Sequence, residues 1–104
     1  MKGKRILIVD DNALNRELLE GMLENLGHDS EIAESGEQAI KMLSHDFDLV
    51  LLDVMMPGID GFETAKRIRV NKEMNGIPII MVTALGDKES RLKAVEAGAN
   101  DFIS

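Results

Sequence analysis

The sequence of 104 residues contains no cysteine, tryptophan or tyrosine, and only 3% of its residues are aromatic. Without cysteine the chain has no disulfide framework, no thiolate zinc site and no cysteine nucleophile. So few aromatic rings give little support to stacking on a flat cofactor or on bases. Basic residues are also in the minority, with 12 against 19 acidic residues and a net charge of −7. We therefore expect no nucleic-acid-binding surface, because such a surface needs clustered Lys and Arg.

Long apolar runs are missing as well. No segment approaches the roughly 20 apolar residues of a membrane span. The first apolar run, Ile6–Val9, ends in acids after four residues, which is too early for a signal peptide. We therefore expect a cytoplasmic protein that makes no membrane contact. A hydrophobic content of 44% is enough for one packed core, so we expect a single domain over residues 1–104.

Short apolar runs recur along the chain, and each is too brief for a helix. Such runs predict strands that are buried on both faces of a sheet. The predicted strands are 6–9, 49–52 and 79–82, with a weak edge strand at 31–33 and a last strand that begins at Phe102.

The segments between these strands carry apolar residues at three- and four-residue spacing, which predicts amphipathic helices. The first helix extends from Leu14 to Leu26, and the last helix has Leu92 and Val95 on its buried face. Strands that alternate with helices indicate an α/β fold with a parallel sheet covered on both faces.

Helix ends are marked by residues with a known preference for them. Ser35 and Asp60 stand where N-caps are expected, each followed three residues later by Gln or Glu. Gly27 and Gly98 follow the last apolar residues of two helices and are predicted to end them.

Acidic and polar residues follow the predicted strands. Asp10 and Asp11 come after the first strand. Asp53 comes after the third strand and Thr83 after the fourth. In an open α/β sheet ligands bind beyond the carboxyl ends of the strands. We therefore expect three carboxylates and one hydroxyl to converge on one edge of the sheet.

Each of these residues also has an ordinary structural interpretation. Asp10 and Asp11 are of the type preferred at helix N-caps. Asp53 is a common turn residue, and Thr83 has the β-branched side chain typical of strands. Asn12 alone suffices as a cap, however, and three carboxylates at one edge repel each other unless a cation compensates them. Clustered carboxylates suit Mg²⁺, and a Mg²⁺ site in turn favours phosphate chemistry.

At these residues the chain resembles the receiver domain of two-component response regulators, along essentially its whole length. The segments that carry the resemblance are, in order, ILIVDDN, LVLLDVMMPGIDGFE, PIIMVTA and GANDFIS. The resemblance implies a flavodoxin-like, doubly wound sheet of five parallel strands in the order 2-1-3-4-5. It also implies a phosphoprotein of phosphorelay signal transduction.

The resemblance assigns a role to each acidic residue of the expected site. Asp53 resembles the phosphoacceptor, which takes a phosphoryl group from the phosphohistidine of a histidine kinase or phosphotransfer protein. Asp11, Asp53 and the backbone carbonyl of Met55 resemble the Mg²⁺ ligands. Asp10 resembles the acid that acts on the ion through water.

Two further residues resemble the parts that pass the signal on. Thr83 resembles the switch residue, whose hydroxyl moves to bond the phosphoryl oxygen. Phe102 occupies the aromatic position that turns inward when Thr83 moves, but it lacks the hydroxyl of a tyrosine. The family implies a shift of the face around the fourth helix and fifth strand, toward an output domain or effector protein.

The end of the chain departs from the family. Receivers place a lysine, usually followed by proline, after the segment that resembles GANDFIS, and then a final helix, whereas this chain stops at Ser104. We therefore expect a receiver fold with its final helix missing and with part of the apolar surface of strands 6–9 and 49–52 bare. A bare apolar patch usually finds a partner, so we expect this form to self-associate through that face or to be less stable.

Three functional hypotheses follow. The first is a phosphorylation-dependent signalling switch, which is a regulatory phosphoacceptor and not an enzyme beyond its own phosphorylation and dephosphorylation. The alternative is a receiver-like scaffold that docks a partner without being phosphorylated, and the absent lysine favours it. A Mg²⁺-dependent phosphohydrolase of the haloacid-dehalogenase kind ranks last, because it places its nucleophile in a D-x-D motif after the first strand, where this chain has Asp-Asp-Asn.

Overall fold

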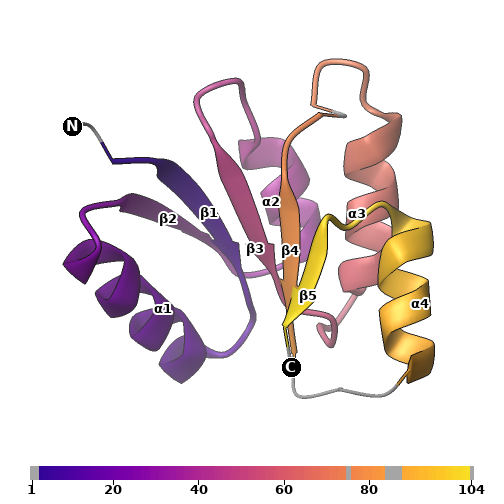
Figure 1. The fold of residues 1–104 in the computed structure, drawn as a ribbon, viewed down its shortest axis with the longest axis horizontal. Helices are drawn as coiled ribbons and strands as arrows, with labels where there is room; N and C mark the ends of the chain where they lie inside the picture. The colour runs from indigo at the N-terminus through magenta and orange to yellow at the C-terminus, as the bar shows by residue number, and fades with distance from the viewer. Residues whose placement is uncertain (1–2, 75, 84–87, 104) are drawn as a thin grey trace.

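A parallel β-sheet forms the centre of the protein, whose computed structural model describes residues 3–74, 76–83 and 88–103 (Figure 1). Its strands are β1 (Arg5–Val9), β2 (Asp29–Ala33), β3 (Leu49–Leu52), β4 (Ile79–Val82) and β5 (Asp101–Ile103). Neighbouring strands are parallel, and their order is β2-β1-β3-β4-β5. This order confirms the expected flavodoxin-like, doubly wound sheet. Ser104 lies outside the described residues.

The described helices connect the strands. They are α1 (Ala13–Asn25), α2 (Gly36–Met42), α3 (Gly61–Val70) and α4 (Lys88–Ala97). Helices α2, α3 and α4 cover one face of the sheet, and α1 lies on the other (Figure 1). Among the described residues β5 is the last element. None of the helices described is long and apolar enough to cross a membrane.

The helix ends follow the predicted signals. The side chains of Ser35 and Asp60 each accept a hydrogen bond from the backbone N–H three residues later, at 3.1 and 2.8 Å, so both residues are N-caps. Gly27 and Gly98 have φ of +83° and +99°, the left-handed conformation in which glycine ends a helix without steric cost. These local signals set where α1, α2, α3 and α4 begin or end.

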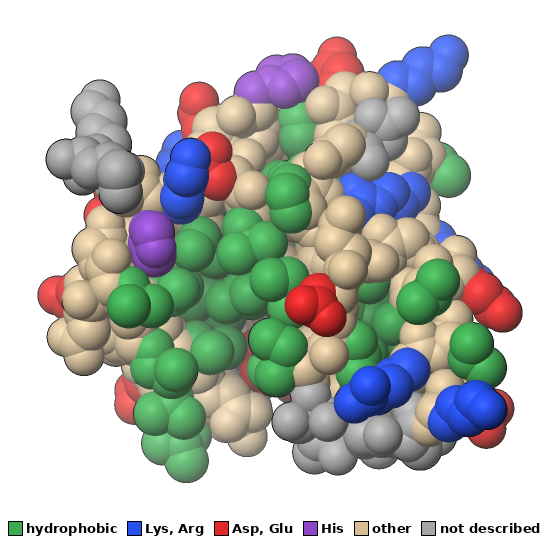
Figure 2. Space-filling model, in the orientation of Figure 1, with side chains coloured by type: hydrophobic (Ala, Val, Ile, Leu, Met, Phe, Trp, Pro, Cys, Tyr) green, Lys and Arg blue, Asp and Glu red, His purple; other side chains and the backbone are tan. Residues whose placement is uncertain are grey.

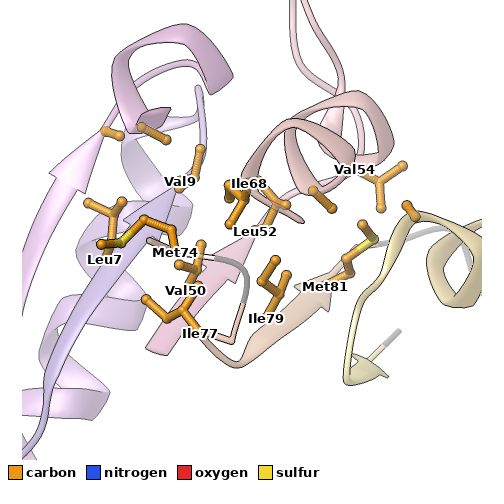
Figure 3. Packing of buried hydrophobic residues seen from close by; sticks show 14 of the residues in the cluster. Leu7, Val9, Val50, Leu52, Val54, Ile68, Met74, Ile77, Ile79 and Met81 are labelled. Atoms are coloured by element: carbon orange, nitrogen blue, oxygen red, sulfur yellow. The ribbon is translucent and has the colours of Figure 1, made fainter. Parts of the chain in front are cut away.

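The hydrophobic core lies between the sheet and the layer of α2, α3 and α4 (Figure 3). Alternate residues of the central strands face this layer and are buried: Leu7, Val9, Val50, Leu52, Ile79 and Met81. The helices contribute Ala39, Ala65, Ile68, Ala94 and Ala97. Because most of these helix residues are small, the helices approach the sheet closely and cover it fully.

The buried face of α4 differs from the prediction. Leu92 and Val95 are 54% and 71% exposed, whereas α4 buries Ser90, Ala94 and Ala97. Spacing alone does not distinguish a face of small residues from a face of large ones. The buried face of α4 therefore consists of small side chains, and the larger ones point to solvent.

The opposite face of the sheet is covered unevenly. Ile6 and Ile8 of β1 are buried, which contradicts the expectation that this strand lies bare. Leu49 and Leu51 of β3 are only half-buried, as expected for that strand. The side chains that face the same way on β4, Ile80 and Val82, are half-buried too. The cover from α1 therefore reaches the sheet at β1 and β2 and leaves β3 and β4 partly open.

The guanidinium of Arg69, at the end of α3, joins three parts of the chain. It donates hydrogen bonds to the carbonyls of Gly98 and Ile77, at 2.8 and 2.6 Å, and to Oδ1 of Asn100 at 2.8 Å. The same Oδ1 accepts from the N–H of Ile79. A Cβ at position 98 would lie 2.6 Å from Cγ of Arg69, so glycine is also needed for this close approach. Arg69 thereby fixes the turn between α4 and β5 against β4.

We expect Arg69→Ala to lower the free energy of unfolding by about 2 kcal/mol, because it removes charge-assisted bonds to carbonyls that have few other donors. Arg69→Lys keeps the charge but not the planar fork, and should recover less than half of the loss. Urea denaturation measures both. The control is Arg67→Ala, which removes an exposed ion pair with Glu63 and should cost about 0.5 kcal/mol or less. Equal losses for the two alanine variants would contradict this role.

Candidate functional site

Three carboxylates meet at the carboxyl end of the sheet. Asp10, Asp11 and Asp53 each present one carboxylate oxygen, and these oxygens lie within 4.8 Å of one another. Asp10 is buried, Asp53 is half-buried and Asp11 is exposed. The strand register explains why these acids lie close together. Val9 of β1 pairs with Leu52 of β3, so the residues that follow them, Asp10 and Asp53, lie at the same edge of the sheet.

In the loop after β1, the residue that caps α1 is not one of the acids. Asn12 is the N-cap of α1, since its side chain accepts a hydrogen bond from the N–H of Asn15 at 3.0 Å. Asp10 accepts a bond from the N–H of Asn12 at 2.9 Å through Oδ1. Asp10 therefore shapes the loop with one oxygen, and Asp11 takes no part in capping. The capping interpretation accounts for Asn12 and leaves the two acids for another role.

The start of α3 holds the loop that follows β3. The N–H of Gly61 donates to the carbonyl of Val54 at 2.8 Å. A Cβ at position 61 would lie 2.3 Å from the carbonyl oxygen of Asp53, so only glycine fits there. The Asp-Gly pair at the start of α3 thus combines an N-cap with a close approach to the backbone that carries Asp53.

An open cleft of about 410 Å³ adjoins the acidic cluster. Four of the residues singled out in the sequence line it: Asp10, Asp53, Met55 and Thr83. Its other lining residues are Asn15, Leu18, Leu19 and Val82. Sequence reasoning missed the three residues from α1, although their position in the first two turns after the acids was a usable signal. The lining of the cleft therefore combines the carboxylates of Asp10 and Asp53 with apolar side chains.

Thr83 and Phe102 occupy different sides of this region. Thr83 is buried, lines the cleft and donates its backbone N–H to the carbonyl of Ile103 at 3.0 Å. Phe102 pairs with Met81 in the sheet, packs against the core and has the guanidinium of Arg91 5.8 Å from its ring centre. The two residues are joined by the β4–β5 ladder, and Phe102 does not line the cleft.

The acidic cluster shifts the ionisation of its central member. Burial raises the pKa of the Asp53 carboxyl from 3.8 to about 6, and the negative charge of Asp10 adds to the rise. Backbone N–H groups of Met55 and Val54 bond to the carboxylate and partly offset it, and Asp11 contributes a smaller rise. Asp53 is therefore a more basic carboxylate than usual, yet mostly ionised at pH 7.

The donor set fits Mg²⁺. This ion prefers carboxylate and carbonyl oxygens, keeps several waters and is bound through one or two carboxylates in phosphate-handling sites. Asp10, Asp11 and Asp53 offer three such oxygens in one small region that is open to solvent on the side of Asp11. A divalent cation would also relieve the repulsion that raises the pKa of Asp53.

Comparison with known protein families identifies the class. The family model described as the response regulator receiver domain matches residues 6–104. The chain therefore belongs to the response regulator receiver domain family. Receiver domains are regulatory phosphoacceptor domains of two-component systems; they bind Mg²⁺ at an acidic cluster and interact with histidine kinases and output domains.

Relatives agree in sequence and in fold. The transcriptional regulatory protein ResD of Bacillus subtilis is 46% identical over 95% of this chain, which matches 40% of ResD. The response regulator TrrA of Thermotoga maritima, solved in complex with Mg²⁺-BeF, has a TM-score of 0.84 and 42% identity over 96% of this chain and 84% of that chain. The chemotaxis protein CheY4 of Vibrio cholerae has a TM-score of 0.89 and is 29% identical over 97% of this chain and 85% of the CheY4 chain. The chain thus spans less than half the length of ResD.

We expect Asp53→Asn to stabilise the metal-free protein at neutral pH. Because folding raises the pKa of this carboxyl, the folded state holds the proton more tightly, and the resulting stability is lost as pH rises from about 4 through about 6. After discounting for solvent access, the variant should gain roughly 1 kcal/mol at pH 7, or about 4 °C in Tm, and little at pH 4. Thermal melts in EDTA measure the difference between variant and parent.

The control for this measurement is Glu24→Gln, which removes an exposed acid at the far end of α1. It removes one acidic group that lies outside the cluster and so controls for the loss of one formal negative charge. A gain for Asp53→Asn that is equal at pH 4 and pH 7 would contradict the raised pKa.

Proposed function

We propose that this chain is a cytoplasmic, phosphorylation-dependent signalling switch that accepts a phosphoryl group on Asp53 from a histidine kinase or phosphotransfer protein. The single observation that supports this choice is the position of Asp53, which adjoins two further acids and lines an open cleft. Membership of the receiver family supports the same reaction. On this proposal residues 1–104 form one receiver unit.

In the proposed reaction the Asp53 carboxylate is the nucleophile. One carboxylate oxygen attacks the phosphorus of the donor phosphohistidine, so an O–P bond forms as the P–N bond breaks. The leaving imidazole nitrogen keeps the electron pair and takes up a proton. Without the cation this carboxyl has a pKa of about 6 and is mostly ionised at pH 7, and a bound cation would favour the ionised, nucleophilic form further.

Magnesium would be held by Asp11, Asp53 and the backbone carbonyl of Met55, with Asp10 acting through water. When bound, the ion supplies positive charge to the phosphoryl oxygens and to the acids around them. The fold orients Asp10, since it is buried and its Oδ1 accepts a hydrogen bond from the N–H of Asn12. Asp11 is exposed, so its side chain would have room to adjust to the ion.

The switch proposal extends to Thr83 and Phe102. Thr83 lines the cleft beside Asp53, and this position supports a role in which its hydroxyl moves to bond a phosphoryl oxygen. Its backbone N–H donates a hydrogen bond to the carbonyl of Ile103, next to Phe102. A movement of Thr83 would therefore shift β5 as well. Phe102 packs beside α4, where Arg91 covers its ring. We infer that phosphorylation changes the α4–β5 face, which then contacts an output domain or effector protein.

We expect acetyl phosphate and Mg²⁺ to add one phosphoryl group, seen as a single mass increase of about 80 Da by intact-mass spectrometry. Asp53→Asn should abolish the increase, because the nucleophile is lost, and EDTA should reduce it at least tenfold. Asp60→Asn is the control, since Asp60 is a nearby N-cap outside the acidic cluster. Retention of the phosphoryl group by Asp53→Asn would assign the reaction to another residue.

The docking scaffold remains the second candidate, and one observation favours it. Leu14, Leu18 and Met22 of α1 are more than half exposed, and Figure 2 shows hydrophobic side chains gathered between α1 and the middle of the sheet. If acetyl phosphate leaves the mass unchanged although Mg²⁺ binds, docking through this surface becomes the better account.

We further propose that the occupant of this surface is a second copy of the chain. The surface, which we call the α1 face, consists of Leu18 and Met22 with Leu49, Leu51 and Ile80 of the sheet. Contiguous apolar side chains of this kind on a small domain favour association. The acidic net charge opposes it, so we expect the association to be weak and to strengthen with salt.

Sedimentation across a concentration series should therefore show a monomer–dimer equilibrium. Leu18→Gln should weaken the dimer at least fivefold, because it places an amide in the centre of the α1 face. Val70→Gln is the matched control, since Val70 is 79% exposed but lies at the end of α3, on the opposite side of the sheet. A monomer at all concentrations, or equal effects of the two variants, would refute self-association through this face.

A further inference from the structure

Arg16 of α1 reaches back to the acidic loop. Its Nη1 donates a hydrogen bond to the backbone carbonyl of Asp10 at 3.0 Å, and its Nη2 lies 3.7 Å from Oε1 of Glu34, just after β2. Only 16% of the Arg16 side chain is exposed, which is little for an arginine on a helix without buried residues. The guanidinium therefore links the ends of β1 and β2 at the edge that carries the acids.

The backbone of Asp10 is held by hydrogen bonds on both sides, and the bond from Arg16 is one of them. The N–H of Asp10 donates to the carbonyl of Ala33 at 3.1 Å, its carbonyl accepts from Arg16, and its Oδ1 accepts from the N–H of Asn12. Both sides of its peptide backbone are thus held, one by β2 and one by Arg16. Without Arg16, the Asp10–Asp11 peptide unit loses the bond that sets its plane.

The charge of Arg16 acts on the loop and not directly on the carboxylates. In the described part of the chain, no ion pair joins a basic side chain to Asp10, Asp11 or Asp53. The carboxylate oxygens therefore stay available to a cation. Glu34 holds the second amino group of the guanidinium, so Arg16 is kept in place without taking an oxygen from the cluster.

We propose that Arg16 is a positioning residue for the acidic cluster: its bond to the Asp10 carbonyl orients the 10–12 loop so that Asp10 and Asp11 face Asp53. This inference rests on the proposed function insofar as the oriented acids are Mg²⁺ ligands. It goes further by assigning their orientation to a side chain on α1. Partners that orient metal ligands are worth about 10–100-fold in affinity.

The first test needs no metal. Hydrogen exchange of the Asn12 amide, which donates to Asp10, reports the order of the loop, and the amide of Ile8 in β1 is the reference for global opening. Arg16→Ala should speed exchange at Asn12 at least tenfold relative to Ile8. Arg16→Lys should recover part of the protection, because its ammonium reaches the carbonyl but does not also span to Glu34. Arg67→Ala, which removes the same charge from an exposed site, should leave the ratio unchanged.

The second test measures Mg²⁺ affinity by calorimetry for the same variants. We expect about tenfold weaker binding for Arg16→Ala, an intermediate value for Arg16→Lys and the parental value for Arg67→Ala. Unchanged exchange at Asn12 in Arg16→Ala would overturn the inference, as would unchanged affinity together with faster exchange. If the parent itself fails to bind Mg²⁺, the proposed function fails, and the exchange ratio alone decides whether Arg16 orients the loop.

Discussion

Repulsion among three carboxylates is the constraint on which the site depends. The sheet brings Asp10, Asp11 and Asp53 within a few ångströms, and burial keeps water from screening two of them fully. The cost appears as the raised pKa of Asp53. A protein selected only for stability would place neutral residues here, so the repulsion points to a site that receives positive charge, as a divalent cation would supply.

The fold tolerates this repulsion because the backbone around the acids is tightly held. The carbonyl of Asp53 is approached so closely by α3 that only Gly61 fits, and the N–H groups of Val54 and Met55 turn toward its carboxylate. Asp10 is bonded on both sides of its peptide backbone. Rigid strands and helix ends thus fix the acids, while the cleft beside them stays open. This division suits a site that accepts a group and then passes on a movement.

Much of this arrangement was predictable from the sequence, and the failures share one cause. The strands, the N-caps and the meeting of the acids follow from local patterns and from the rule that parallel strands end at one edge. The prediction of which side of α4 is buried was wrong. The spacing of apolar residues does not say whether Leu92 and Val95 or the alanines beside them contact the sheet. The role of Arg16 was missed for a similar reason: its partner lies six residues away and is a backbone carbonyl, which no side-chain pattern reveals.

The two faces of the sheet differ in how fully they are covered. On one face alternate strand residues meet three helices and are buried, which stabilises the domain. On the other face Leu51, Ile80 and Val82 are only half-covered although they are equally apolar in sequence. Leu18 and Val82 line the same cleft as Asp53, so an occupant of that face would lie next to the site. An occupant of the α1 face would therefore also form part of the surroundings of Asp53, so the proposed association and the proposed phosphorylation are expected to influence each other.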